Sequence, residues 1–398
     1  MADAPWVTII GLGEDGLDGL PPASREALTQ AEVVMGPPRH LVLVGEVTAE
    51  VIEWPVPFAD GIATLIGLRG RQVAVLASGD PFWFGAGRAI ARALEPGEWR
   101  ALPGASTFSL VASYLGWPLE DTICLGLHAA PLSRLRRYLA PGARAIVLLR
   151  DGAAAAALAD YLNEVGFGDS TLHVCAAMGG PREDVTRVSV AQARSGAFDH
   201  PVCVALDCAG NGPALPRASG LPDDLFESDG VMTKRAVRAL TLSALAPSPG
   251  EHLWDLGAGS GTVAVEWNLA HPTCRATCVE VRADRVALIR ANAAAFGLDL
   301  AVVEEDLADA LDGLDRPDAV FVGGGLDRAL LDDLKARLAA GTRLVANAVT
   351  LESEALLAEA QAELGGDLVR IEMANMIPMG SKRGWKASYP VVQWSVVL

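Results

Sequence analysis

Short apolar runs alternate with segments of helical periodicity through the first half of the chain. Strands are predicted at 6–13, 31–36, 72–79, 122–127, 145–150, 171–178 and 202–208. Apolar residues three and four positions apart predict helices at 85–94, 107–115, 133–139 and 153–165. Such alternation is typical of α/β layers.

The second half repeats this plan more regularly. Strands are predicted at 252–257, 275–281, 300–306, 319–324, 343–349, 368–374 and 391–398. Helical patterns lie between most of them, but no helical pattern separates the last two. This half is therefore predicted to form a Rossmann-like, seven-stranded α/β sheet.

Two breaks in composition divide the chain. Residues 209–224 are rich in Gly and Pro and follow an apolar strand, so we expect a linker at 209–220 between domains 1–208 and 221–398. A softer break near 116–121 predicts that the first domain consists of two α/β lobes, about 1–117 and 118–208. A length of 398 residues agrees with two or three domains.

Composition excludes several classes of protein. The formal charge is -17 and the sequence pI is near 4.8, so a broad nucleic-acid-binding face is not expected. A small anionic substrate can still be held by a few local arginines. No apolar stretch reaches the roughly 18 residues of a membrane span, and residues 1–13 lack the basic region of a signal peptide.

The six cysteines do not form a C-x-x-C motif and lack a histidine at zinc-ligand spacing. We therefore expect no metal site. Free cysteines without a secretion signal predict a cytoplasmic protein.

The most informative motif is WDLGAGSG at 254–261, followed by Glu280 at the end of the next apolar run. Gly257, Gly259 and Gly261 allow close approach of a ligand to a strand–turn–helix, and an acidic residue about 20 positions later suits ribose hydroxyls. A P-loop Lys-Ser/Thr is missing, which argues against a triphosphate ligand. A G-x-G-x-G turn preceded by Asp255 resembles the S-adenosylmethionine (SAM) site of class I methyltransferases.

A second glycine motif, GLGEDG at 11–16, matches the G-x-G-x-x-G pattern of NAD sites. The position about 20 residues later holds Gly36, Pro37 and Pro38 instead of an acidic strand end. The context that a NAD site requires is therefore missing.

Three further stretches, 78–87, 103–118 and 126–135, complete a pattern that begins with GLGEDG. Together they resemble the tetrapyrrole (corrin) methylase family, in which two lobes hold SAM between them. The resemblance places these residues around SAM: Gly11, Gly13, Gly79, Asp80, Ser106 and Thr107. Asp80 is alternatively a cap for the helix expected after it.

The chain departs from this family at two places. Glu14 stands where the family commonly has Pro, and the family's LHGR-like stretch reads Leu127-His128-Ala129-Ala130. These departures keep open an alternative in which the first domain is a tetrapyrrole-binding or dimerisation scaffold and only the second is catalytic.

Stretches 221–245, 317–325 and 344–353 resemble the decarboxylating methyltransferase domain of cobalamin biosynthesis. The whole chain then resembles the fused, decarboxylating precorrin methyltransferases. The resemblance implies methylation of a precorrin of the 6Y/6B type at C5 by the first domain. It implies methylation at C15, with loss of the ring C (C12) acetate carboxylate, by the second, giving a precorrin-8 product. A tRNA or protein methylase is the rival for the second domain alone.

The resemblance also assigns site residues in the second domain. SAM contacts are expected from Thr233, Asp255, Gly257, Ala258, Gly259, Gly261, Glu280 and Asp306. Substrate contacts are expected from Arg235, Gly323, Gly324, Gly325, Asn347, Lys382 and Arg383, and in the first domain from Arg88. Catalytic candidates are Asp80, His128 and Lys234. The expected cofactor is SAM, one per domain, the expected partner is an anionic tetrapyrrole, and the chain is expected to be a homo-oligomer.

Some of these residues have a structural alternative. Asp306 is alternatively a helix cap, and residues 233–235 are alternatively an exposed helix start. The basic run 380–390 is either a binding hairpin or a charged turn.

Overall fold

The first lobe is built around β1, the opening apolar run of the chain. Its five strands are all parallel, in the order β3-β2-β4-β1-β5. Their bounds are β1 Val7–Leu12, β2 Val33–Gly36, β3 Glu50–Glu53, β4 Val73–Ser78 and β5 Trp99–Leu102. Successive side chains of β1 point to opposite faces of the sheet. Ile9 packs with Ile90 in one core, and Ile10 packs with Leu28 in the other. A central parallel strand covered on both faces accounts for the unbroken apolar run.

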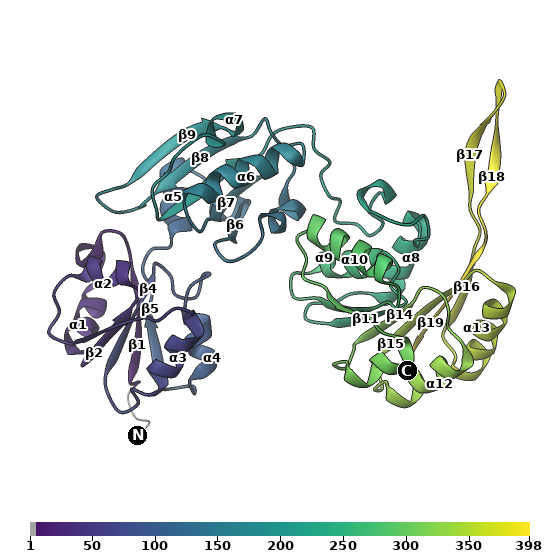
Figure 1. Ribbon diagram of the computed structural model, residues 1–398, viewed down its shortest axis with the longest axis horizontal. Helices are drawn as coiled ribbons and strands as arrows, with labels where there is room; N and C mark the ends of the chain where they lie inside the picture. Colours follow the sequence, from purple (N-terminus) through teal and green to yellow (C-terminus); the bar gives the residue numbers. More distant parts are fainter. Residues whose placement is uncertain (1–4) are drawn as a thin grey trace. The chain divides into compact units, whose positions relative to one another are not determined.

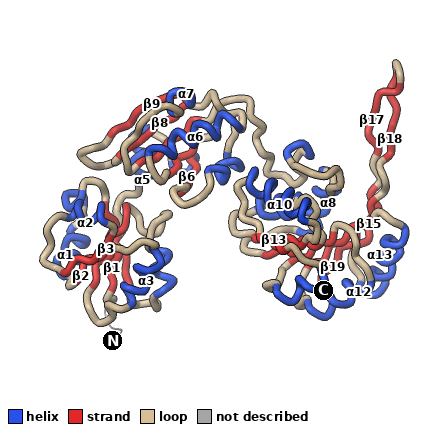
Figure 2. Tube along the Cα trace, in the orientation of Figure 1, coloured by secondary structure: helices blue, strands red, loops and turns tan. Residues whose placement is uncertain are grey.

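Helices lie on both sides of this sheet (Figure 2). They are α1 Pro22–Gln30, α2 Pro38–Val44, α3 Phe58–Ile66 and α4 Gly87–Ala93, with a 3₁₀ turn η1 at Gly16–Gly19. The computed structural model describes residues 5–398 and divides into two units. The division falls between Pro213 and Ala214, and the short segment Ser133–Arg137 is grouped with the second unit.

The second lobe has a mixed five-stranded sheet in the order β6-β7-β10-β8-β9. Its strands are β6 Thr122–Gly126, β7 Arg144–Leu148, β8 Thr171–Ala176, β9 Asp184–Ser189 and β10 Val202–Asp207. Its helices are α5 Thr107–Leu115, α6 Gly152–Glu164 and α7 Val190–Ala193, with 3₁₀ turns at Leu119–Asp121 and Leu132–Tyr138. The helix predicted at 133–139 is thus a 3₁₀ segment.

Helix α5 comes before the sequence break that suggested the lobe boundary, yet it packs with the second sheet. Phe108 and Val111 share a core with Ile146 and Cys203. The helix ends at Gly116 in the left-handed conformation, φ +67, which is the break that the sequence displays.

The second unit contains a seven-stranded sheet in the order β13-β12-β11-β14-β15-β19-β16 (Figure 1). The strands are β11 His252–Leu256, β12 Arg275–Val279, β13 Ala301–Val303, β14 Ala319–Val322, β15 Arg343–Ala348, β16 Asp367–Ile371 and β19 Val391–Val397. Only β19 runs against its neighbours. The seven-stranded α/β prediction is therefore confirmed.

The helices of this unit follow the strands in turn. They are α8 Arg235–Leu245, α9 Thr262–Ala270, α10 Ala283–Ala295, α11 Leu307–Ala310, α12 Arg328–Arg337 and α13 Leu351–Leu364, with 3₁₀ turns at Asp223–Leu225 and Leu311–Gly313. Two cores flank the sheet, one around Trp267 and the other around Trp394.

A two-stranded hairpin projects from this unit (Figure 1). It consists of β17 Ala374–Met379 and β18 Lys382–Ala387, which pair with each other and form a separate sheet. Because β16 runs parallel to β15, the hairpin leaves the same sheet edge at which β11, β14 and β15 end.

The six cysteines form no disulfide. Within residues 5–398, no group of three or more His, Cys, Asp or Glu side chains is arranged to hold a metal ion. Over the same residues, no helix is both long and apolar enough to cross a membrane.

Candidate functional site

The glycine loop of the second unit connects β11 to α9 at the carboxyl edge of the sheet. Gly257, Gly259 and Gly261 have φ of +69, +60 and +71, respectively. These left-handed conformations are strained for residues with a Cβ, which explains why three glycines stand here. The resulting turn presents backbone to the space above the strand ends, as ligand sites in open α/β sheets do.

Glu280 holds this loop. Its Oε2 accepts from the backbone N–H of Gly259 at 2.9 Å, and its Oε1 accepts from that of Arg282 at 3.0 Å. A carboxylate has about four lone-pair positions, so two acceptor positions remain for ligand hydroxyls. The arrangement fits the ribose role expected for Glu280.

Asp255, on β11, connects the strand before the loop to the helix after it. It is buried, and its Oδ2 accepts from the backbone N–H of Ala264 at 3.2 Å in the first turn of α9. Burial raises the pKa of Asp255 to about 7, and the nearby Glu280 carboxylate adds to the rise while the Ala264 hydrogen bond opposes it. Asp255 therefore contacts α9 and is enclosed by protein.

Two backbone segments border the loop. A Cβ built on Gly257 would lie 3.8 Å from the carbonyl oxygen of Gly324, and one on Gly259 would lie 4.0 Å from that of Val231. The 323–325 turn and the segment before α8 thus lie next to the candidate SAM position, as a substrate turn and a lid would. Gly323, Gly324 and Gly325 are all exposed at the end of β14.

Buried polar side chains fix the segment before α8. The Asn292 amide donates to the carbonyls of Glu227 and Ser260 and accepts from the Glu227 N–H at 2.8 Å. Arg238, which is fully buried, donates to Glu266 Oε1 at 2.5 Å and to the carbonyl of Thr233 at 2.6 Å. These contacts were not predicted from the sequence, because the partners are far apart in the chain.

Other residues predicted in this unit occupy varied positions. Lys234 is the exposed N-cap residue of α8, and Arg235 is exposed beside it. Asp306 caps α11 by accepting from the Ala308 N–H at 3.1 Å. A helix cap was the alternative to a SAM contact for this residue. Lys382 and Arg383 are exposed on β18. Because β18 pairs with β17, the basic run 380–390 contains the second strand of a hairpin.

Asn347 lies inside a buried polar cluster. Its Nδ2 donates to Thr241 Oγ1 at 3.1 Å, and its Oδ1 accepts from Gln393 Nε2 at 3.0 Å. With an exposure of 6%, Asn347 ties β15 to α8 and β19. The structure places it in the core instead of at a substrate surface.

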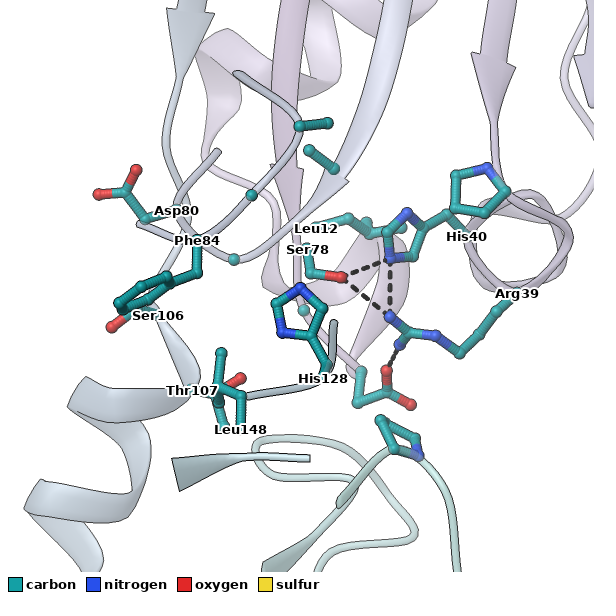
Figure 3. Close-up of a pocket in the computed structure, with 18 of the residues that line it drawn as sticks. Leu12, Arg39, His40, Ser78, Asp80, Phe84, Ser106, Thr107, His128 and Leu148 are labelled. Carbon is teal, nitrogen blue, oxygen red and sulfur yellow. Dashed lines mark hydrogen bonds and ion pairs between the residues drawn. The ribbon is translucent and has the colours of Figure 1, made fainter. Parts of the chain in front are cut away.

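The first unit encloses a cavity of about 640 Å³ between its two lobes. Figure 3 shows part of its lining. Of the residues expected near SAM or the reaction, the lining includes Gly13, Gly79, Asp80, Ser106, Thr107 and His128. Phe108, Cys175, Met178 and Cys203 make part of the wall apolar.

Gly11 and Arg88 do not line this cavity. A Cβ on Gly11 would lie 1.9 Å from Gly79 O and 2.4 Å from Gly104 N, so Gly11 lets three strand ends pack together. Arg88 is exposed on α4. Neither the cofactor role of Gly11 nor the substrate role of Arg88 gains support from these positions.

Asp80 and Ser106 both have local hydrogen bonds. Asp80 Oδ1 accepts from the Phe82 N–H at 2.8 Å in a turn, so it caps no helix; α4 begins only at Gly87. Ser106 Oγ accepts from the Ser109 N–H at 3.1 Å as the N-cap of α5. Both residues still border the cavity.

A polar cluster lies on the opposite wall (Figure 3). Arg39 Nη2 lies 2.9 Å from both His40 Nε2 and Ser78 Oγ, and His40 Nε2 lies 3.0 Å from Ser78 Oγ. Arg39 also pairs with Glu14, which pairs with Arg182 at 3.2 Å. The divergent residue Glu14 thus links the first lobe to the β8–β9 turn of the second.

Burial and the adjacent Arg39 charge lower the pKa of His40 to about 4 from 6.5, against an opposing hydrogen bond to the Leu76 backbone. The unfolded state therefore binds the proton more readily, and this contribution to stability is full above pH 6.5 and lost as the pH falls toward 4. We expect the first unit to lose about 2 kcal/mol between pH 7.5 and 5 through this group.

Hydrogen exchange of peptides from β1 and β4, corrected for intrinsic rates at each pH, measures this loss. In His40→Gln the pH-dependent contribution should disappear. Identical pH dependence in the wild type and the variant would show that His40 does not couple to folding.

Two family models match the chain: Tetrapyrrole (Corrin/Porphyrin) Methylases over residues 7–194, and Precorrin methyltransferase domain over residues 224–398. A Sinorhizobium sp. protein named Precorrin-6Y C(5,15)-methyltransferase (decarboxylating) is 46% identical over 398 residues, 98% of this chain and 96% of that protein. The chain belongs to the precorrin-6Y C(5,15)-methyltransferase family.

This family is one of SAM-dependent methyltransferases, so the chain is a methyltransferase. A Salmonella typhimurium protein named Cobalt-precorrin-6B C(15)-methyltransferase (decarboxylating) is 32% identical over 179 residues, 43% of this chain and 92% of that protein. The crystal structure of the C-terminal domain of precorrin-6Y C5,15-methyltransferase from Rhodobacter capsulatus is 49% identical, covers 46% of this chain and 100% of that chain, and has a TM-score of 0.45.

Proposed function

We propose that the chain methylates a precorrin at C5 and C15 and removes one acetate carboxylate, as a step of cobalamin biosynthesis. Each domain would hold one SAM, the first in its inter-lobe cavity and the second at the glycine loop after β11. The observation that carries this proposal is similarity over the full chain to a two-carbon, decarboxylating methyltransferase. A cavity in the first unit and a glycine loop in the second supply two separate candidate sites.

We assign C15 methylation and decarboxylation to the second domain, and C5 methylation to the first. The Salmonella relative, whose name carries only the C(15) and decarboxylating activities, matches 179 residues. The second family match, 224–398, has nearly that length. The remaining activity, at C5, then falls to the tetrapyrrole methylase domain.

SAM, when bound, supplies a methyl group on a positively charged sulfur. The reacting carbon of the ring is the nucleophile. The protein's contribution is therefore to orient the ring carbon and the methyl donor and to hold them close together. In the second domain the Gly257–Gly261 turn allows close approach, and Glu280 orients the nucleoside. Segment 226–233 borders the glycine loop, with the Val231 carbonyl 4.0 Å from a Cβ placed on Gly259. Lys234, Arg235, Lys382 and Arg383 remain candidates for contacts to substrate carboxylates.

Mass spectrometry of the product formed from precorrin-6B and SAM tests this function. The expected product has gained two methyl groups and lost one carboxyl group as carbon dioxide. A product with one added methyl group would favour the alternative in which the first domain is a scaffold. No change in mass would contradict the proposal.

The location proposed is the cytoplasm. The support is the absence of disulfides among the six cysteines, which suits a reducing compartment. Detection of the chain in an oxidising compartment with paired cysteines would contradict it.

We also propose that the chain forms a homo-oligomer through the β17–β18 hairpin. An isolated two-stranded hairpin is at best marginally stable in water, and this one exposes Met376, Met379 and Trp385. Burial of these side chains against a second copy would remove apolar surface from water.

Replacement of Trp385 by Ser, together with Met379 by Ser, should shift the assembly toward monomer, as measured by sedimentation. The matched control is Leu351→Ser, because Leu351 is 79% exposed and Trp385 is 77% exposed. A hairpin variant that sediments like the wild type would overturn this interface.

A further inference from the structure

Arg39 presents its guanidinium to the cavity of the first unit beside the hydroxyl of Ser78 (Figure 3). Arg39 belongs to α2, which follows β2, and Ser78 is the last residue of β4. Because β2 and β4 are parallel neighbours, both residues emerge at the carboxyl edge of the first sheet. Ligands of open α/β sheets bind at this edge.

The guanidinium is held in a fixed orientation. Its Nη1 pairs with Glu14, and its Nη2 donates to His40 Nε2 and Ser78 Oγ, each at 2.9 Å. A guanidinium has five N–H donors, so these three contacts leave two for a ligand. His40 is 3% exposed and accepts from Arg39, which makes it a buried support for the arginine.

The cluster carries a net positive charge. Two cations, Arg39 and Arg182, share the single carboxylate of Glu14, and His40 is neutral at pH 7 because burial lowers its pKa. The sum over these three side chains is one positive charge, and the extra cation is Arg182, which is 60% exposed and outside the cavity lining. At the cavity itself, the guanidinium of Arg39 is the part of the cluster that faces a ligand.

We propose that Arg39 and Ser78 bind a carboxylate side chain of the tetrapyrrole in the first domain, with His40 and Glu14 as positioning residues. This inference rests on the proposed function. Arginine donates charge-assisted hydrogen bonds to carboxylates, and the Ser78 hydroxyl, whose proton rotates between His40 Nε2 and a ligand, supplies a further donor. The contact fixes the rotation of the macrocycle in the cavity and hence which carbon faces the methyl donor.

The amino-acid end of SAM also carries a carboxylate. That end carries an ammonium as well, so it is neutral overall, and the sulfonium adds a positive charge. The two cations of SAM are repelled by the Arg39 guanidinium, whereas the acetates and propionates of the tetrapyrrole have no adjoining cation.

Arg39→Met and Ser78→Ala test the inference in the full chain. Equilibrium binding of the precorrin to the first domain should weaken between about 10- and 100-fold in Arg39→Met, because charge-assisted hydrogen bonds are lost. The KM for C5 methylation should rise by a similar factor. Arg39→Lys, which keeps the charge but not the fork geometry, should show an intermediate loss.

Two measurements separate the possible outcomes. Affinity for S-adenosylhomocysteine should stay within about twofold of the wild type, which also shows that the first domain is folded. Arg71→Met is the control, because Arg71 pairs with Glu50 on the surface of the same lobe. Weaker binding of S-adenosylhomocysteine with unchanged precorrin affinity would overturn the proposal, as would unchanged affinity for both.

A precorrin analogue with carboxamides in place of its carboxylates completes a double-mutant cycle. The analogue should bind wild type and Arg39→Met with equal affinity; an unequal loss would contradict a carboxylate contact. Failure of the wild type to methylate C5 would reject the proposed function instead. The binding comparison does not depend on turnover and would still decide the role of Arg39.

Discussion

Replacement of Gly259 by Arg should abolish C15 methylation and decarboxylation while C5 methylation continues. Gly259 has φ +60, and its N–H donates to Glu280 at 2.9 Å. A side chain at this position is strained and would project into the space that the loop offers to SAM. The rate at C15 should fall by about 100-fold or more, since small misplacement of reactants costs on the order of 10²-fold.

The measurement is product analysis with methyl-labelled SAM, using mass spectrometry for the number of methyl groups and NMR for their positions. Gly341→Arg is the matched control: Gly341 also has positive φ, and a Cβ there would meet no atom within 4 Å. Loss of both methylations in Gly259→Arg, with the control intact, would contradict independent sites.

Replacement of Arg238 by Met should destabilise the second unit by about 3–5 kcal/mol, the usual cost of breaking a buried ion pair. The substitution leaves the buried Glu266 carboxylate without its cation. It also removes the donors to Asp223 and to the Thr233 carbonyl. The segment before α8 would then lose one of its two anchors, while the Asn292 contacts to Glu227 remain.

Native-state hydrogen exchange of the β11 amides reports this loss. Arg328→Met is the control, because Arg328 is 43% exposed and pairs with Glu359 and Glu363 on the surface; exposed pairs contribute about 0–1 kcal/mol. A loss below about 1 kcal/mol in Arg238→Met would show that the buried network is dispensable.

The sequence predicted the elements whose physical signals are local. The buried strand β11 and its glycine turn stood out because left-handed backbone requires glycine and a central parallel strand requires an apolar run. Strand β3 was missed because three of its four residues are exposed. Strand β9 was missed for the same reason. The β17–β18 hairpin is also mostly exposed, and the sequence predicted it only as one of two alternatives for residues 380–390.

The residues of the candidate sites were likewise predictable only where the signal is local in the sequence. Asn347 was assigned as a substrate contact by resemblance, whereas in the structure its partners Thr241 and Gln393 come from other elements. Arg39 and Ser78 lie 39 positions apart and meet only because β2 and β4 are neighbours. Convergence of distant side chains depends on topology, which the residue pattern alone does not determine.

Two independent methyl-transfer sites in one chain require two binding sites for S-adenosylhomocysteine, the demethylated product. Isothermal titration of this product into the intact chain and into Gly259→Arg counts them. We expect a stoichiometry of two for the wild type and one for the variant. A stoichiometry of one that falls to none would contradict it and leave the first domain as a scaffold.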